Sequence, residues 1–312
     1  MAWTYPPPVA GLDGTLTIPQ IHYLLKNPGL VARRVRDLAL YGYIADFLLT
    51  GRYQAQGGVI MYPNGEPVFS DNDPEAVGVG GEYPLDTVGA GTLATAKTVK
   101  WGRDVEIYDE SIAAMNIDPV NRAIRALVNS NIKYIDSVAL GVIASKITRT
   151  YTGASWSALT TGDQIVDDVL GAIAATVELE DGFDINTVVL KPSQFAKVRA
   201  RLSAADLLPR EGANPIEAGF ASFDYLGLSW VMSMHSPVTD PLLLDREQLG
   251  GMANWDIQSP GYASAGGVGV EVATWRLGGE ANRDGYRVRA RRITAPVVIE
   301  PNAGVKILNT AI

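Results

Sequence analysis

The longest run of regularly spaced hydrophobic positions lies between Asp118 and Ile147. Apolar residues recur there mostly in steps of three and four, at Val120, Ile124, Leu127, Val128, Ile135, Val138, Val142, Ile143 and Ile147. This spacing predicts one apolar stripe of an amphipathic helix, and Asp118 followed by Pro119 is a favoured helix start. A helix of about 29 residues would be roughly 43 Å long, which is about two to three times the average. We therefore expect a strut that the rest of the chain covers on at least two sides.

The chain before this helix has a different pattern. Residues 1–28 are rich in proline, and we interpret them as an extended arm that contains no helix. A short helix is predicted from about Leu30 to Leu49, because its apolar residues fall on one side and Gly51 can end it.

Residues 57–96 are rich in glycine and proline, with short β-type runs separated by turn signals such as Pro63-Asn64-Gly65. About forty such residues are too many for an ordinary loop of a compact domain. They predict a two-stranded arm that reaches away from the body, with a disordered insertion as the alternative. The strict alternation of Val99 to Ile107 predicts a half-buried strand.

The chain after the long helix is predicted to be mixed α/β. Residues 148–158 are rich in serine and threonine and are interpreted as a linker. Helices are expected at Gln164–Val177 and Pro192–Leu202, and strands at Ile185–Leu190, Tyr225–Met232 and Pro241–Leu244. Further strands are expected at Val268–Trp275, Tyr286–Arg292, Ala295–Glu300 and Gly304–Leu308, which we predict to pair antiparallel with Val99–Ile107 and to pack on the long helix.

Composition narrows the function. The chain has 312 residues, enough for two domains with real cores. Its net charge of −8 argues against a general nucleic-acid binder. It contains no cysteine, which rules out disulfides and thiolate chemistry and suits a reducing cytoplasm. The N-terminus lacks the pattern of a signal peptide, and no apolar run is long enough for a membrane span.

Candidate chemistry is sparse, and each candidate has an ordinary structural explanation. His22 and His235 have no nucleophile or metal-ligand partner at useful spacing. The glycine cluster 78–81 lacks the helix that a phosphate loop needs, and Ser264 lacks nucleophile-elbow spacing. Asp71, Asp73 and Glu75 lack the glycine and closing glutamate of a calcium loop. The acidic pair 109–110 is explained by the dipole of a following helix. We therefore predict no catalytic, cofactor-binding or metal-binding residue.

One basic stretch has two interpretations. Alternation places Arg287, Arg289 and Arg291 on one side of a strand, next to Arg292. A solvated edge strand that resists wrong pairing is one explanation. An ion-pair surface for a neighbouring subunit, or a contact to packaged DNA, is the other.

The order of these elements, together with several short sequences, resembles the major capsid proteins of tailed bacteriophages, which have the Hong Kong 97-type fold. Sequences 81–84 (GEYP) and 98–102 (TVKWG) are similar to the extended-loop return of actinobacteriophage capsid proteins. Sequences 249–252 (LGGM), 259–262 (SPGY) and 284–292 (DGYRVRARR) are similar to later blocks of the same family. The resemblance covers nearly the whole chain.

The resemblance implies an α+β capsid fold divided into four regions. Residues 1–50 would be the N-terminal arm and short helix, and residues 51–98 the extended β-loop lying across a neighbouring subunit. Residues 99–152 and 268–312 would form the peripheral domain with the spine helix, and residues 153–267 the axial domain that meets its copies at fivefold and sixfold axes.

The same resemblance implies partners and a place of action. The partners would be copies of the chain in hexamers and pentamers, with portal, scaffold or decoration proteins and non-specific proximity to double-stranded DNA, and no membrane. The location would be the virion capsid, assembled in the host bacterial cytoplasm. The N-terminal scaffolding segment of some relatives is expected to be absent. Some relatives form a Lys–Asn link between subunits, but nothing marks a pair among Lys97, Lys100, Asn302 and Asn309, so no link is predicted.

Two alternatives stay open. An encapsulin shell would have the same fold around an enzyme cargo, but the length of the arm and the phage-type loop favour a phage capsid. A soluble enzyme built on the α/β region would need a pocket with convergent titratable groups, which the sequence does not offer.

Overall fold

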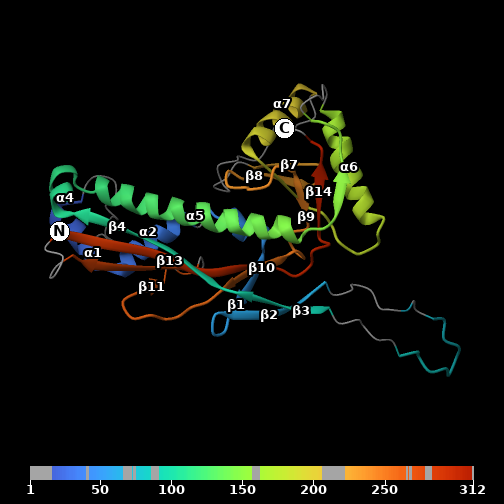
Figure 1. The fold of residues 1–312 in the computed structure, drawn as a ribbon, viewed down its shortest axis with the longest axis horizontal. Coiled ribbons are helices and arrows are strands. Elements are labelled where there is room, and N and C mark those ends of the chain that lie inside the picture. The colour runs from blue at the N-terminus through green and yellow to red at the C-terminus, as the bar shows by residue number, and fades with distance from the viewer. Residues whose placement is uncertain are drawn as a thin grey trace, which may run out of the picture. The chain divides into compact units, whose positions relative to one another are not determined.

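The computed structural model describes residues 16–39, 42–65, 72, 75–85, 91–156, 162–205, 222–264, 266, 269–277 and 283–310. The predicted long helix is confirmed as α5 (Asp118–Lys146), with 29 residues (Figure 1). Its stripe is buried as expected at Ile124, Leu127 and Ile143, among others.

Two compact units make up the chain. The first comprises residues 1–43, 99–135 and 254–294, and the second residues 44–98, 136–253 and 295–312. Helix α5 and strand β13 (Gly285–Val298) each contribute residues to both units.

The first unit is built on an antiparallel sheet with β13 in the middle. On one side β13 pairs with β4 (Val99–Tyr108), and on the other with β12 (Val270–Arg276), which in turn pairs with β11 (Ala263–Ser264). The predicted strand at 99–107 and its pairing with the basic strand are thus confirmed. Helices α1 (Ile18–Lys26) and α2 (Pro28–Ala39) contact β12, and α4 (Asp109–Met115) follows β4.

The expectation that residues 1–28 contain no helix was wrong for α1. Pro19 lies in the first helical turn, where its missing N–H costs nothing, and the Thr17 N–H donates to the Gln20 side chain at 2.9 Å. Leu24 and Leu25 are buried and anchor the helix. Residues 1–15, the rest of the expected arm, lie outside the described residues.

The helix expected over 30–49 is interrupted. Its two parts are α2 and α3 (Ile44–Leu48). Gly42 lies between them, and a Cβ atom there would come within 2.4 Å of the Ile132 side chain. A larger residue at this point would therefore require the Ile132 side chain on α5 to shift.

The second unit contains a six-stranded sheet in the order β5 (Thr150–Thr152), β14 (Gly304–Leu308), β9 (Leu242–Leu244), β6 (Thr187–Leu190), β8 (Leu228–Met232) and β7 (Ser222–Tyr225). Helices α6 (Asp163–Val177) and α7 (Pro192–Ala204) share a buried core with this sheet that includes Trp230. Strand β14 was expected beside β4, and that expectation was wrong, because it pairs with β5 and β9.

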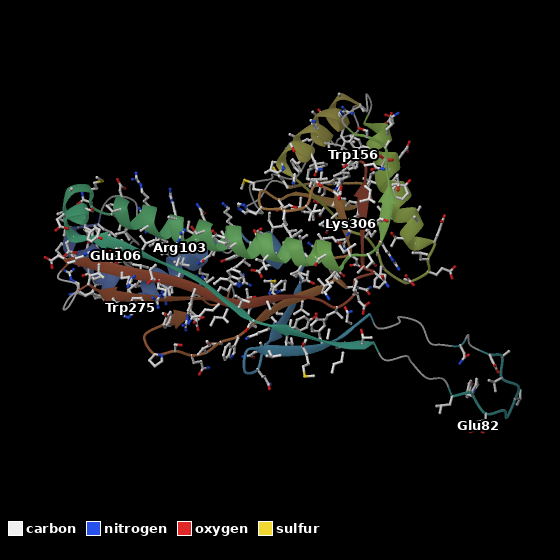
Figure 2. All side chains as sticks on the ribbon, in the orientation of Figure 1. Glu82, Arg103, Glu106, Trp156, Trp275 and Lys306 are labelled. Carbon is white, nitrogen blue, oxygen red and sulfur yellow. The ribbon has the colours of Figure 1, made fainter. Side chains whose placement is uncertain are left out.

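The stretch interpreted as a linker is also part of this core. Trp156 is fully buried, and its indole N–H donates to the Asp168 carboxylate on α6 at 2.8 Å (Figure 2). The same carboxylate oxygen accepts the Ala154 N–H at 3.1 Å. The linker interpretation rested on the serine and threonine content of residues 148–158. It overlooked Trp156, whose burial anchors this segment in the core.

The second unit also includes β1 (Gly51–Gln54), β10 (Gly250–Asn254) and the end of β13, paired in that order. A Cβ atom at Gly251 would lie 2.3 Å from the backbone oxygen of Gly51, so these strands approach too closely for any side chain. A two-stranded hairpin, β2 (Val59–Asn64) and β3 (Thr92–Lys97), confirms that the stretch predicted over residues 57–96 contains a strand pair, with β3 ending one residue beyond it.

A charge at Leu127 should prevent folding. Leu127 is fully buried on α5, so Leu127→Asp would leave an unpaired carboxylate in the core at a cost of several kcal/mol. We expect the variant to be insoluble or to lack a cooperative thermal transition. Ala126→Asp, one residue away on the exposed face, is the matched control and should unfold like the wild type. A soluble, cooperatively folded Leu127→Asp protein would contradict this assignment of the buried face.

Candidate assembly surfaces

The β2–β3 hairpin has two different faces. Its register pairs Tyr62 with Ala94 and Ile60 with Ala96. Because strand side chains alternate, these four lie on one face, and they pack against Ala253 and Val297 of the second unit. The Gly65 N–H also donates to the Ile299 carbonyl at 2.9 Å. This inner face fastens the base of the hairpin to its own chain.

The outer face of the hairpin is exposed and carries four apolar side chains, together with Thr95 and Lys97 of β3. Met61 is 62% exposed and Leu93 is 69% exposed, and Val59 and Pro63 on the same face are exposed as well. We call Val59, Met61, Pro63 and Leu93 the outer hairpin patch. Isolated apolar side chains on a surface are ordinary, but a contiguous group on one sheet face marks an interaction site.

The described part of the loop between β2 and β3 continues this exposure. Tyr83 is 82% exposed and Leu85 is 98% exposed. Glu82, beside them, is also exposed (Figure 2). Such side chains obtain no burial from their own subunit.

The arginine strand is not a solvated edge. Strand β13 lies between β4 and β12, so that explanation of its basic residues was wrong. Cross-strand neighbours place Asp104 beside Arg289 and Glu271 beside Arg291. Arg287 has two cross-strand neighbours, Glu106 on β4 and Trp275 on β12. Figure 2 labels both neighbours. The sheet therefore alternates cations with carboxylates.

Arg289 and Asp104 form a forked pair with two hydrogen bonds. The guanidinium Nε and Nη2 donate to the two carboxylate oxygens at 2.6 and 2.7 Å, and Arg287 adds a contact to Asp104 at 3.0 Å. Hydrogen bonding to Arg289 lowers the pKa of Asp104 below its ordinary value, with the nearby positive charges adding to the effect. The guanidinium of Arg289 also lies over the ring of Trp275, 4.9 Å from its centroid.

Arg291 is buried and enclosed by groups of its own chain. Its Nε donates to Glu271 at 2.6 Å, its Nη2 donates to the Ser259 hydroxyl at 2.9 Å, and it stacks 3.5 Å from the centroid of the Tyr262 ring. Arg292, also buried, lies over the Tyr43 ring. A neighbouring subunit or DNA would have to compete with these partners, so either contact stays a prediction for the more exposed Arg287.

The sequence analysis missed one carboxylate that organises the second unit. Asp136 is fully buried in α5, and its two oxygens accept the backbone N–H groups of Ile44 and Ala45 at 3.3 and 3.0 Å. These N–H groups begin α3 and have no helical partner. The sequence analysis considered only the apolar stripe of this helix, and the position of Asp136 directly after Ile135 of that stripe was the signal available.

The residues considered for chemistry are not brought together. The imidazole Nδ1 of His22 lies 3.2 Å from the Tyr286 hydroxyl, the Ser264 hydroxyl accepts the Gly266 N–H, and residues 78–81 form an exposed turn. Asp109 pairs with Arg276, and Asp71 and Asp73 lie outside the described residues. In the described ranges, no three His, Cys, Asp or Glu side chains are grouped as a metal site would need. None of the helices in those ranges has the length and apolarity to span a membrane.

Comparisons with known proteins identify the class. Residues 92–307 match the model of a family described as phage capsid protein. The chain therefore belongs to that family, and its fold is the Hong Kong 97-type capsid fold. This membership agrees with the capsid resemblance that the sequence showed. No curated protein matches the sequence.

Solved structures show the same fold at low identity. The capsid of cyanophage P-SCSP1u aligns with a TM-score of 0.58 and 13% identity over 83% of this chain and 86% of that one. Mycobacterium phage Adephagia aligns with a TM-score of 0.56 and 11% identity over 85% and 89%. The SrpI encapsulin of Synechococcus elongatus aligns with a TM-score of 0.52 and 13% identity over 95% and 92%.

Removing the Asp104 charge should destabilise the first unit. Asp104→Asn replaces a forked ion pair, and we expect a loss of about 1–3 kcal/mol in the free energy of unfolding at pH 7. Glu106→Gln is the matched control on the same strand face. Its carboxylate makes a 3.5 Å contact with the exposed Arg283 and accepts a hydrogen bond from the Tyr108 hydroxyl, which the glutamine oxygen can still accept, so the change should cost under about 1 kcal/mol.

The pH dependence tests the cause of the Asp104 effect. The pKa of Asp104 is lower in the folded protein than in the unfolded chain, where it is about 3.9. The ionised carboxylate therefore stabilises the fold fully above that unfolded pKa, and the stabilisation is lost as the pH falls through the folded pKa. The difference between wild type and Asp104→Asn in urea unfolding of unassembled subunits should therefore shrink below about pH 4. A difference that stays constant down to pH 2 would exclude the ion pair as its source.

Proposed function

We propose that this chain is the major capsid protein of a tailed double-stranded DNA phage, which assembles through hexamers and pentamers into an icosahedral shell around the genome. Family membership supports a capsid shell protein. The observation that carries the proposal further is the outer hairpin patch, which is apolar, exposed and fastened to its own chain only from behind.

The energetics favour burial of this patch against another copy. Fully burying a side chain such as Met or Leu contributes about 1.5–3 kcal/mol. Met61 and Leu93 retain most of their exposure in the single chain, so most of that gain is available to association. A contact between two different surfaces of the same chain repeats head to tail and can close into rings. Stability then depends partly on assembly.

The regions inferred from sequence fit this role. We propose residues 1–50 as the N-terminal arm and short helix, and residues 51–98 as the extended loop that lies on a neighbour. Residues 99–152 and 268–312 would form the peripheral domain, and residues 153–267 the axial domain near the symmetry axes.

Partners and location follow from the same proposal. The shell would be built from copies of this chain, with a portal and scaffold or decoration proteins, in the cytoplasm of a host bacterium. Contact with packaged DNA would be non-specific. The role needs no catalytic residue and no cofactor, and we propose that the protein is not an enzyme, in contrast to the soluble-enzyme alternative.

An encapsulin-type shell is the second candidate, and a specific observation favours keeping it. The SrpI encapsulin has the same fold over nearly the whole chain. A phage shell isolated from cells carrying the native genome would contain long, nuclease-protected DNA. An encapsulin shell would contain a stoichiometric protein cargo.

The outer hairpin patch gives the direct test of assembly. Met61→Asp with Leu93→Asp places charges on the exposed face and leaves the inner contacts of Tyr62 and Ala94 intact. We expect folded subunits or capsomers and no closed shells by negative-stain electron microscopy. Met61→Leu with Leu93→Met keeps the patch apolar and should assemble like the wild type.

Deleting residues 57–96 should have the same effect on shells, but it also uncovers Ala253 and Val297 and so tests the patch less cleanly. Normal shells from the double aspartate variant would remove the patch from the assembly contact. A wild-type protein that stays a monomer at high concentration would refute the shell function itself.

A further inference from the structure

The first half of α5, which belongs to the first unit, carries an exposed basic face (Figure 1). Helical periodicity places Arg122, Arg125, Asn129 and Lys133 within an arc of about 100°, on the side opposite the buried stripe. All four are exposed. At 1.5 Å per residue, Arg122 and Lys133 lie about 17 Å apart along the helix axis. We call these four residues the α5 basic stripe.

The cations of the stripe have no partner in their own chain. Between residues 119 and 146 the single acidic residue is Asp136, which is fully buried and binds the backbone at the start of α3. Asp118 is exposed at the start of α5 but forms no ion pair with Arg122, four residues further on. Within the part of the chain that the structure describes, the side chains of Arg122, Arg125 and Lys133 form no salt bridge and no hydrogen bond.

Other cations of the first unit show what a structural role looks like in this protein. Arg289 and Arg291 of β13 are each paired with a carboxylate across the sheet. Acidic residues are plentiful, since the chain has 34 of them against 26 basic ones. A basic face without one acidic partner, in a chain of net charge −8, therefore points to a negatively charged partner outside the chain.

The neutral residues of the helix support the same conclusion. Asn121 and Asn129 stand four residues before and after Arg125, and Asn129 also stands four residues before Lys133. Glutamate at such positions would stabilise the helix through ion pairs with the cations, and asparagine is a poorer helix former than glutamate. The sequence therefore leaves the cations free, at some cost to the helix. Asparagine can itself donate hydrogen bonds to phosphate oxygens.

The chemistry of the stripe fits a nucleic-acid backbone better than a protein. Protein interfaces are built around apolar and aromatic residues with few charges at their centre. The exposed side from Arg122 to Lys133 carries no apolar side chain larger than that of Ala126. A DNA duplex presents roughly ten phosphate charges over about 17 Å of its axis, and it is bound through cations without any apolar anchor.

The stripe and Arg287, the other candidate for contact with DNA, lie on opposite sides of the first unit. A Cβ atom at Gly42 would come within 2.4 Å of Ile132 on α5, and the next residue, Tyr43, has its ring under the guanidinium of Arg292. These contacts place α5 on the sheet face of Arg292. Alternation puts Arg287 on the opposite face, where it contacts Asp104 at 3.0 Å.

We propose that the α5 basic stripe lines the inside of the shell and contacts the phosphate groups of the packaged DNA. The proposal rests on the proposed shell function and names the surface through which the shell meets its genome. Each copy contributes a few weak contacts that do not depend on the base sequence, and their repetition over the shell adds them together. Arg287 is then left to a neighbouring subunit.

A single thiol tests which way the stripe faces. Asn129→Cys places the chain's one cysteine in the middle of the stripe. A maleimide carrying a bulky polyethylene glycol should label this thiol in free subunits and in shells opened with denaturant, but not in closed shells. Labelling of closed shells at the rate of free subunits would place the stripe outside and overturn the proposal. Absence of wild-type shells would refute the proposed function instead.

DNA binding by unassembled subunits tests the contact itself. Arg125→Gln with Lys133→Gln removes two cations and keeps good helix formers. In titrations with a short DNA duplex at low salt, we expect this variant to bind about tenfold more weakly or worse. The slope of log affinity against log salt concentration should shrink by about 2, because each phosphate contact contributes about 0.9.

The matched control is Lys197→Gln with Arg199→Gln on α7. It also removes one lysine and one arginine from the exposed side of a helix, so the net charge changes equally. This control should bind the duplex like the wild type. Equal losses in both double variants would show that net charge governs binding, and a wild-type protein without affinity for the duplex would remove the contact. Either result overturns the proposal.

Polyglutamate is the second probe, because it presents carboxylates in place of phosphates. We expect wild-type subunits to bind it more weakly than a duplex of equal charge. Equal or tighter binding of polyglutamate that is lost in Arg125→Gln with Lys133→Gln would identify the stripe as a site for an acidic protein and overturn the contact with DNA. These binding results do not depend on whether shells form, so they are separate from the test of the shell function.

Discussion

The constraint on which this structure depends is that a single chain cannot bury all of its own hydrophobic surface. The core of each unit is filled by the stripes of α5, α6 and α7 and by strands β13, β6 and β9. The outer hairpin patch and the exposed Leu170 and Val177 of α6 remain uncovered in the same chain. Both lie on regular secondary structure, and exposed apolar groups of this kind mark sites of interaction.

The arrangement of charge follows a related logic. The arginines of β13 look from sequence like a basic surface, but Asp104 and Glu271 satisfy them across the sheet. Tyr262 and Trp275 cover two of the guanidinium groups as well. These cations hold the first unit together and add little free positive charge. The unpaired charges among the described residues include Asp163 and Asp167 on α6 and Lys197 and Arg199 on α7.

Local sequence patterns were enough to predict most of the helices and strands. The spacing of apolar residues identified α5 to within one residue, because a stripe of that length cannot be satisfied by any other conformation. Alternation identified β4, and turn signals located the β2–β3 hairpin. The misjudged elements failed for two different reasons. Helix α1 had a local start signal at Thr17, Pro19 and Gln20, which the proline-rich composition of residues 1–28 hid. The order of residues 150–156 depends on a distant partner, because Trp156 reaches Asp168.

The sequence by itself determined the long helix and the strand pair of the β2–β3 hairpin, because these follow from local spacing and from residue types. Its resemblance to a known family indicated the class of fold. Only the tertiary structure decided that β13 is a central strand, that β14 joins the other sheet and that Asp136 begins α3. It also decided which side of each helix stays exposed. These features depend on contacts between residues far apart in the chain, and strand pairing and burial at such separations leave no periodic mark in the sequence.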